Sequence, residues 1–254
     1  MIQVRNLWKR YGSIEVLKGL NLDVKQGETL VILGRSGVGK SVLLRHIIGI
    51  EKPDQGTITV GDTEITSCKK TTLYHTVKNM GMLFQGAALF DSLNIEQNIS
   101  FYLRQHGDPV TKKPYSESIL KHKVQESLAM VGLEGSEKKM PSDLSGGMRK
   151  RAGLARLIAY RPAILLYDEP TTGLDPITAQ QINELIVQTQ KELKSTSIVV
   201  THDIHSAIFI ADRLALHKNG TIAYVADPDT FFNIDDPIIH FLKDHISQQL
   251  RKGS

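Results

Sequence analysis

Hydrophobic and polar residues alternate along the first part of the chain in the way that β-strands require. In "IQVRNLW", residues 2–8, and "LNLDV", residues 20–24, apolar side chains alternate with polar ones, so one face of each strand can be buried. The run "TLVIL", residues 29–33, is apolar throughout and predicts a fully buried strand. It leads through a glycine-rich loop to "SVLLRHIIGI", residues 41–50, where apolar positions recur at helical spacing. The pattern therefore predicts a strand, a glycine loop and a helix in direct succession.

Turn residues predict two hairpins. The stretch "GTITVGDTEI" predicts a hairpin that turns at Gly61-Asp62, and "LALHKNGTIAYV" predicts one that turns at Asn219-Gly220. A further apolar stretch, "NMGMLFQ", predicts a buried strand that ends on Gln85. Together these segments indicate that antiparallel and buried strands coexist in the protein.

Long helical patterns fill the middle of the chain, and strands and helices alternate again beyond it, as in "AILLYDE" and "SIVVTHD". That alternation is typical of an α/β core with parallel strands. We expect one domain over residues 1–254, made of a core with an antiparallel β subdomain (1–93 and 162–225), an inserted helical subdomain (94–161) and a helical tail (226–254). Within the tail, residues 237–250 are expected to form one amphipathic helix that packs against the core.

Composition and charge narrow the class of protein. Of the 254 residues, 41% are hydrophobic and 23% charged, and 31 Lys and Arg against 27 Asp and Glu leave a net charge of only +4, too small to indicate a nucleic acid partner. The basic clusters at 121–123 and 149–151 are interpreted as solvated helix faces. The single cysteine, Cys68, allows no internal disulfide and favours a reducing compartment.

The sequence shows no secretion signal and no run approaching the roughly 18 apolar residues of a membrane-spanning helix. We therefore expect a cytoplasmic protein. If it works at a membrane, another polypeptide must supply the spanning part.

Residues 34–41, "GRSGVGKS", fit the phosphate-binding loop G-x-x-x-x-G-K-[ST], which the strand before it and the helix after it support. The glycines let the backbone curl so that successive N–H groups face phosphate oxygens, the lysine is placed at the β- and γ-phosphates, and the serine hydroxyl binds Mg²⁺. The sequence thus predicts an α/β fold with a P-loop NTPase (RecA-like) core. The expected nucleotide-binding residues of this loop are Gly34, Arg35, Ser36, Gly37, Val38, Gly39, Lys40, Ser41 and Val42.

Polar residues at the ends of other apolar strands complete the expected site. Asp168 suits a Mg²⁺ contact, and Glu169 is then placed to polarise an attacking water. Gln85 can contact both Mg²⁺ and that water, and His202 can bond the γ-phosphate. The expected catalytic residues are Glu169, His202, Gln85 and Lys40, and the expected Mg²⁺ ligands are Ser41, Gln85 and Asp168.

A second phosphate-binding feature stands far from the first. In "LSGGMRKR", residues 144–151, a serine and two glycines open a helix, and a helix start aims free N–H groups and the positive end of the helix dipole at an anion. The residues alone do not explain why one domain should need both features.

The P-loop, Gln85, "LSGGM", "ILLYDE", "GLDP" and "THD" occur in an order that resembles the nucleotide-binding domain of ABC ATPases, over essentially the whole chain. The resemblance implies an ATP-hydrolysing homodimer that uses ATP and Mg²⁺, in which Ser145, Gly146, Gly147 and Met148 of one copy close over the ATP of the other. It also implies that Tyr11 stacks on adenine with Val16 beneath it, and that Asp175 couples the two sites.

Met148 stands where the family usually has Gln, which is similar to the subfamily that energises Mce-type phospholipid transport, the Mla ATPases. This likeness implies a membrane permease and a Mce-type substrate-binding protein as partners, and a peripheral position at the cytoplasmic face of the inner or plasma membrane. Leu89, Phe90 and Leu93 either belong to the core of the helical insert or form a groove for a short permease helix. An ATPase of an amino-acid or methionine importer, or a soluble ABC ATPase of iron–sulfur assembly, remain the alternatives.

Overall fold

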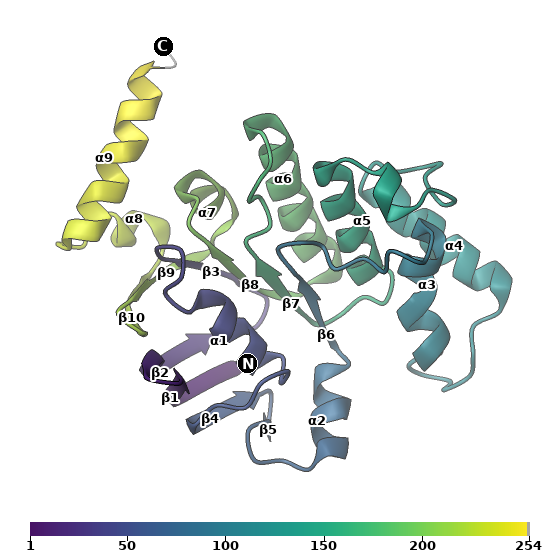
Figure 1. The fold of residues 1–254 in the computed structure, drawn as a ribbon, viewed down its shortest axis with the longest axis horizontal. Helices are drawn as coiled ribbons and strands as arrows, with labels where there is room; N and C mark the ends of the chain where they lie inside the picture. The colour runs from purple at the N-terminus through teal and green to yellow at the C-terminus, as the bar shows by residue number, and fades with distance from the viewer. Residues whose placement is uncertain (253–254) are drawn as a thin grey trace. The chain divides into compact units, whose positions relative to one another are not determined.

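The computed structural model describes the backbone of residues 1–252 and the side chains of residues 1–244 (Figure 1). The residues group into two compact units, one made of Met1–Met80 with the chain from Thr196 onward, the other of Gly81–Ser195. These units are defined by contacts between residues, whereas the expected subdomain boundaries follow the type of secondary structure. The two divisions are therefore not comparable, and the expected subdomains stay a prediction.

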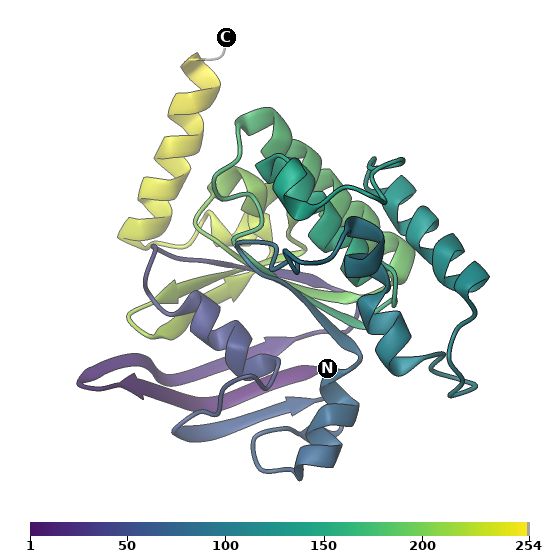
Figure 2. The same cartoon turned by 45° about the vertical axis from the view of Figure 1, so that its right-hand side comes forward.

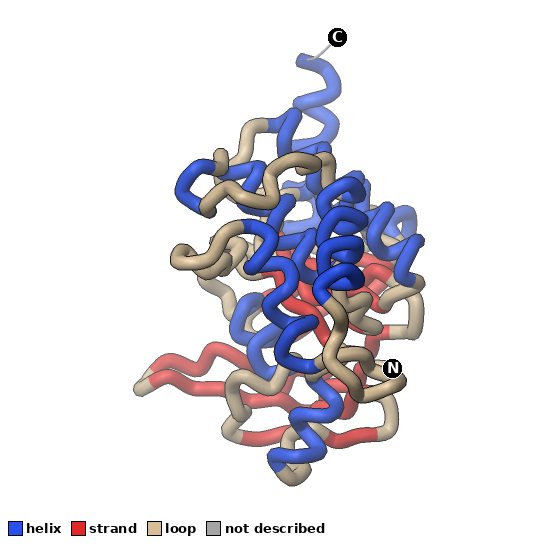
Figure 3. Tube along the Cα trace, turned by 90° about the vertical axis from the view of Figure 1, so that its right-hand side faces the viewer, coloured by secondary structure: helices blue, strands red, loops and turns tan. Residues whose placement is uncertain are grey.

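The first unit contains a four-stranded antiparallel sheet with the order β2-β1-β4-β5. Its strands are β1 (Ile2–Tyr11), β2 (Ile14–Val24), β4 (Gln55–Val60) and β5 (Thr63–Glu64). β1 and β2 form a long hairpin (Figures 2 and 3). The predicted alternation is confirmed, since Ile2, Val4, Leu22 and Val24 are buried while the residues between them in each pair are exposed.

Further strands of the first unit are arranged in the order β10-β9-β3-β8. They are β3 (Thr29–Leu33), β8 (Thr196–Thr201), β9 (Arg213–Lys218) and β10 (Thr221–Ala226). β3 is buried along its whole length, as predicted, and pairs in parallel with β8 and β9. The hairpins predicted at Gly61 and at Asn219-Gly220 are both confirmed, and positive φ angles at Asn219 and Gly220 are those that a two-residue turn requires.

The helices of the first unit are α1 (Lys40–Ile47), α2 (Lys70–Val77), α7 (Ile204–Ile210), α8 (Pro228–Phe231) and α9 (Pro237–Lys252). The sequence did not predict α2, a short and mostly polar segment in which none of the described residues is buried. α9 confirms the predicted C-terminal helix. Ile239 in its first turn is buried and α9 contacts α7, so this end packs as expected. The side chains from 245 onward lie outside the described ones.

The second unit combines a pair of neighbouring strands with a group of helices. Its elements are β6 (Met80–Leu83), which begins at the unit boundary, β7 (Ile164–Asp168), α3 (Ile95–His106), α4 (Glu117–Met130), the 3-10 helix η1 (Pro141–Asp143), α5 (Gly146–Ile158) and α6 (Pro176–Leu193). α5 contacts α3, α4 and α6, and its many buried residues make it the centre of this unit. The mixed architecture confirms the predicted α/β class.

Local sequence explains where these helices begin. Asn94 and Gln97 form a capping box at the start of α3, and Ser116 and Ser145 accept backbone N–H groups at the starts of α4 and α5.

Within the part of the chain that the structure describes, no helix is both long enough and apolar enough to cross a membrane.

Candidate nucleotide-binding site

The glycine loop joins β3 to α1, as predicted. Gly37 and Gly39 have φ angles of +81° and +106°, which other residues rarely adopt. A Cβ atom at Gly39 would lie 2.6 Å from Cγ1 of Val16, and one at Gly34 would lie 2.9 Å from the backbone oxygen of His217. The loop therefore requires glycine for its conformation and for its close packing. A backbone curled in this way forms a concavity of N–H groups that fits a phosphate.

Lys40 carries a positive charge to this loop. Its side chain is buried, and its Nζ atom donates to the backbone oxygens of Gly34 at 2.7 Å and Arg35 at 3.1 Å. The ammonium group thus lies against the curled backbone, while Ser41 follows it in the first turn of α1. Backbone N–H groups, an ammonium and a hydroxyl make a donor set that fits a phosphate chain with its magnesium ion.

His202 lies at the same edge of the sheet as the loop. In the parallel pairing of β3 with β8, Leu33 stands opposite Thr201, so Gly34 and His202 each follow the last residue of neighbouring strands. His202 is exposed. This placement agrees with the predicted contact between His202 and a phosphate, which stays a prediction.

Tyr11, the residue expected to stack on adenine, lies at the end of β1. Its hydroxyl donates to Oε1 of Glu51 at 2.5 Å, and Nζ of Lys9 lies 5.3 Å from the centre of its ring. Burial, together with the bond to Glu51, raises the pKa of Tyr11 to about 12, so the phenol stays protonated. Tyr11 is 41% exposed, which leaves area for a base to cover. Glu51 was not expected to take part, since it is distant in sequence.

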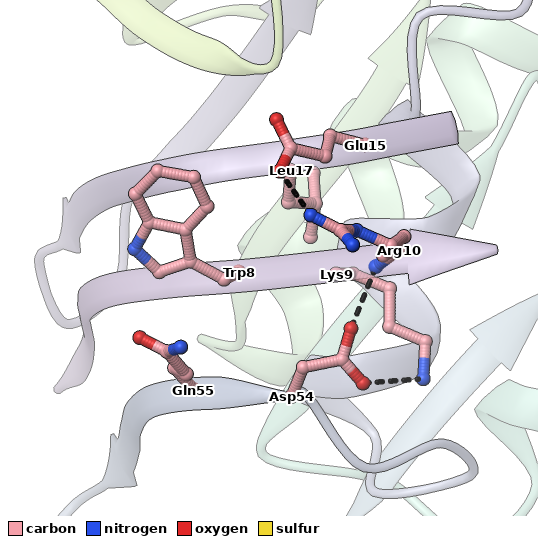
Figure 4. A pocket seen from close by; sticks show the side chains of 7 residues that line it. All are labelled: Trp8, Lys9, Arg10, Glu15, Leu17, Asp54 and Gln55. Atoms are coloured by element: carbon pink, nitrogen blue, oxygen red, sulfur yellow. Dashed lines mark hydrogen bonds and ion pairs between the residues drawn. The ribbon is translucent and has the colours of Figure 1, made fainter. Parts of the chain in front are cut away.

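A pocket of about 430 Å³ opens beside this end of the hairpin (Figure 4). Its lining residues are Trp8, Lys9, Arg10, Glu15, Leu17, Asp54 and Gln55. The charged groups bind one another: Arg10 lies 2.7 Å from Glu15, and Asp54 accepts the backbone N–H of Arg10 and pairs with Lys9 at 3.6 Å. These pairs fix the end of the hairpin that carries Tyr11.

The second unit holds the expected acids. Asp168 ends β7 and Glu169 follows it, with exposures of only 6% and 8%. Glu169 has a φ of +49°, a left-handed conformation that is uncommon outside glycine and often marks a functional site. Thr172 Oγ1 donates to Glu169 Oε2 at 3.1 Å, which orients the carboxylate. The position of both acids at a strand end is confirmed, and their roles stay predictions.

Gln85 lies in the loop after β6, with an exposed side chain. The strand ends at Leu83, so the prediction that Gln85 is its last residue is wrong by two positions. The backbone oxygen of Gln85 accepts a hydrogen bond from Lys150 of α5, and the same ammonium donates to the backbone oxygen of Glu169 at 3.3 Å. The interpretation of residues 149–151 as a solvated face is therefore wrong at Lys150, which is buried.

The start of α5 confirms the helix predicted at "LSGGM". Ser145 is its N-cap and accepts the backbone N–H of Met148 at 3.3 Å. Ser145 and Gly146 are exposed, whereas a Cβ at Gly147 would lie 2.5 Å from Cγ2 of Thr178. The helix start thus packs on α6 through one glycine, while Ser145 and Gly146 remain exposed.

Asp175, expected to couple two sites, is the N-cap of α6. Its Oδ1 atom accepts the backbone N–H groups of Ile177 at 3.1 Å and Thr178 at 3.0 Å. Hydrogen bonds from Thr178 lower the pKa of Asp175, so it is charged at neutral pH. This gives Asp175 a structural role in one copy, and coupling between copies stays a prediction.

Known proteins resemble this chain over most of its length. A profile of the family described as ABC transporter matches residues 17–172. A probable ribonucleotide transport ATP-binding protein of Mycobacterium leprae is 39% identical over 238 residues, which cover 94% of this chain and 67% of that protein. The intermembrane phospholipid transport system ATP-binding protein MlaF of Haemophilus influenzae is 42% identical over 244 residues, which cover 96% of this chain and 90% of that protein.

Solved structures extend this likeness to three dimensions. A dimeric ATP-binding cassette in a post-hydrolysis state, bound to ADP and phosphate, matches with a TM-score of 0.79 and 31% identity over 89% of this chain and 98% of that one. The chain spans about two thirds of the length of the mycobacterial relatives that it matches.

Proposed function

This chain belongs to the ABC transporter family of ATP-binding proteins, and from that premise we propose that it hydrolyses ATP to drive a phospholipid transporter. At the level of the family, the predictions of an ATPase and of ATP and Mg²⁺ as its cofactors are confirmed. The observation that best supports phospholipid as the substrate is the similarity to MlaF, which covers 90% of that protein. Met148 in the signature motif supports the same subfamily.

The first step is the binding of nucleotide by residues of the first unit. The N–H groups of residues 34–41 hold the phosphates, Lys40 moves its ammonium group from loop oxygens to phosphate oxygens, and Tyr11 covers the base. Bound Mg²⁺ neutralises phosphate charge, and ATP supplies the phosphoryl group that is transferred to water. The joint binding of Mg²⁺ by Ser41, Gln85 and Asp168 draws on both units and stays a prediction.

Glu169 polarises the attacking water. Its carboxylate is held by Thr172, and its left-handed backbone fixes the direction in which it leaves β7. His202 stabilises the γ-phosphate from the edge of β8. A fixed carboxylate beside a positioned water supplies general-base assistance without further reorganisation.

A second copy of the chain completes each site. Ser145 and Gly146 present the exposed start of α5, where backbone N–H groups and the helix dipole favour an anion. In a two-fold dimer, this surface of each copy covers the nucleotide of the other, so ATP binding favours closure and hydrolysis favours opening. The dimeric state of the similar cassette supports this arrangement.

A membrane permease receives the resulting motion. Phe90 is 43% exposed, and the centre of its ring lies 4.7 Å from that of Phe101, which is also exposed, while Leu89 and Leu93 beside them are half-buried. We assign this surface to a permease helix at the cytoplasmic face of the membrane, with a Mce-type protein delivering the lipid. Exposed aromatic side chains of this kind favour the groove over the core interpretation.

Co-purification tests the proposal directly. The full chain, tagged at its N-terminus, is isolated from native membranes in mild detergent, and its partners are identified by mass spectrometry. The proposal expects a permease and a Mce-type protein, and expects phospholipid vesicles to stimulate ATP turnover by the complex. Recovery of a soluble nucleotide- or amino-acid-binding protein with the permease, and no response to lipid, would contradict the phospholipid assignment.

A further inference from the structure

One face of α5 holds the loop that follows β6. Lys150, Gly153 and Arg156 recur at three-residue spacing, which places them on one side of the helix. A Cβ at Gly153 would lie 3.2 Å from Cβ of Ala87, so the helix backbone and the loop are in close contact. Arg156 donates to the backbone oxygens of Ala88 at 2.8 Å and Ala87 at 3.0 Å.

The held loop has an unusual backbone. Ala87 and Ala88 have φ angles of +63° and +48°, and consecutive left-handed residues other than glycine persist only where surrounding contacts impose them. The Arg156 bonds and the contact at Gly153 supply such contacts. Several contacts therefore hold the loop against α5.

Lys150 adds a contact between α5 and the end of β7, where Asp168 and Glu169 lie. Its side chain is 6% exposed, and its ammonium group donates to the backbone oxygens of Gln85 and Glu169. An ammonium group has donors and no acceptor, so it can join two carbonyl groups from different segments. Burial lowers the pKa of Lys150, while the nearby Asp168 and Glu169 carboxylates oppose that effect and favour the charged form. If these carbonyl groups moved away, the buried ammonium group would lose its hydrogen bonds at a large cost in free energy.

We propose that Lys150 is a positioning residue that links the start of α5 to the backbone of Gln85 and Glu169 within the same subunit. The inference rests on the proposed function, in which the start of α5 contacts the nucleotide of the partner. When α5 shifts as the dimer closes, Lys150 carries the shift to the two residues that face the subunit's own water and magnesium ion. The position of Gln85 and Glu169 in each site thereby depends on whether nucleotide occupies the other site.

Mixed dimers of the full chain test this role. In one dimer, a subunit carries Lys150→Met together with Glu169→Gln, and its partner is wild type. In the other, one subunit carries Lys150→Met and the partner carries Glu169→Gln. The first dimer keeps its working Glu169 in a subunit with an intact Lys150. In the second dimer, the working Glu169 belongs to the subunit that carries Lys150→Met and so lacks the ammonium group.

The proposal expects the second dimer to turn over ATP about tenfold or more slowly than the first, since small displacements of catalytic groups have effects of that order. Both dimers should bind a fluorescent ATP analogue with similar affinity. Lys150→Arg, which keeps the charge, should restore turnover in the second dimer. The control is Lys121→Met, an exposed lysine of α4, which should leave turnover unchanged.

Equal turnover by the two mixed dimers would overturn the proposal, since loss of α5 stability alone would impair both. If Lys150→Met does not fold, Lys150→Gln takes its place with the same two outcomes. A wild-type dimer that does not hydrolyse ATP would instead contradict the proposed function itself. The two failures are therefore distinguishable.

Discussion

Replacing Gly39 by alanine tests the packing of the phosphate-binding loop. The φ of +106° is strained for any residue with a side chain, at about 1–3 kcal/mol. In addition, the new Cβ would lie 2.6 Å from Cγ1 of Val16, a distance at which one of the two must move. Overpacking of this kind costs roughly 1–3 kcal/mol, and we take ~2 kcal/mol for it.

Gly37→Ala is the matched control. Gly37 also has a left-handed φ, +81°, but its added Cβ would meet no atom within 4 Å. The difference between the two variants therefore isolates the clash with Val16. At roughly 2–4 °C per kcal/mol for a chain of this size, Gly39→Ala should unfold ~4–8 °C below Gly37→Ala.

Differential scanning calorimetry without nucleotide measures both transitions. Adding Val16→Ala to Gly39→Ala removes the clashing methyl group and should recover most of the difference, which the double-mutant cycle reports directly. Equal Tm values for the two glycine variants, or no recovery with Val16→Ala, would refute the packing argument.

Three further predictions concern turnover and coupling. Glu169→Gln should keep ATP affinity, abolish turnover and accumulate ATP-bound dimers on size-exclusion chromatography; rapid turnover would count against its role. Lys40→Ala should weaken ATP binding and turnover together, as measured by titration of a fluorescent analogue and by phosphate release, and unchanged affinity would contradict the phosphate contact. Phe90→Asp or Leu93→Asp should uncouple lipid transport in the reconstituted complex while basal ATP turnover continues, and loss of nucleotide binding in these variants would contradict a permease contact.

Local sequence signals account for most of the fold. Glycines at 61 and 220 mark turns because only particular residues accept positive φ, and the alternation in β1 and β2 follows from a sheet with one buried face. The P-loop could be predicted because its glycine requirement is local to the strand and helix that flank it.

Contacts between distant segments could not be predicted in this way. Glu51 binds Tyr11 from forty positions away, and no pattern near either residue indicates the pair. Lys150 lies in a run of basic residues that resembles a solvated face, yet α5 is central in its unit and has little exposed surface. The spacing of Lys150, Gly153 and Arg156 is the one signal that could have suggested a face in contact with backbone carbonyl groups.

The central claim is that each ATP site needs the P-loop of one copy and the signature motif of another. The test mixes a Glu169→Gln subunit with a Ser145→Arg subunit, each of which should be inactive by itself. The heterodimer then holds one complete site. That site combines Glu169 of the Ser145→Arg subunit with the intact signature motif of the Glu169→Gln subunit. We predict ATP turnover in the mixture that neither parent shows. A mixture as inactive as its parents, or a Ser145→Arg protein that turns over ATP at the wild-type rate, would contradict the account.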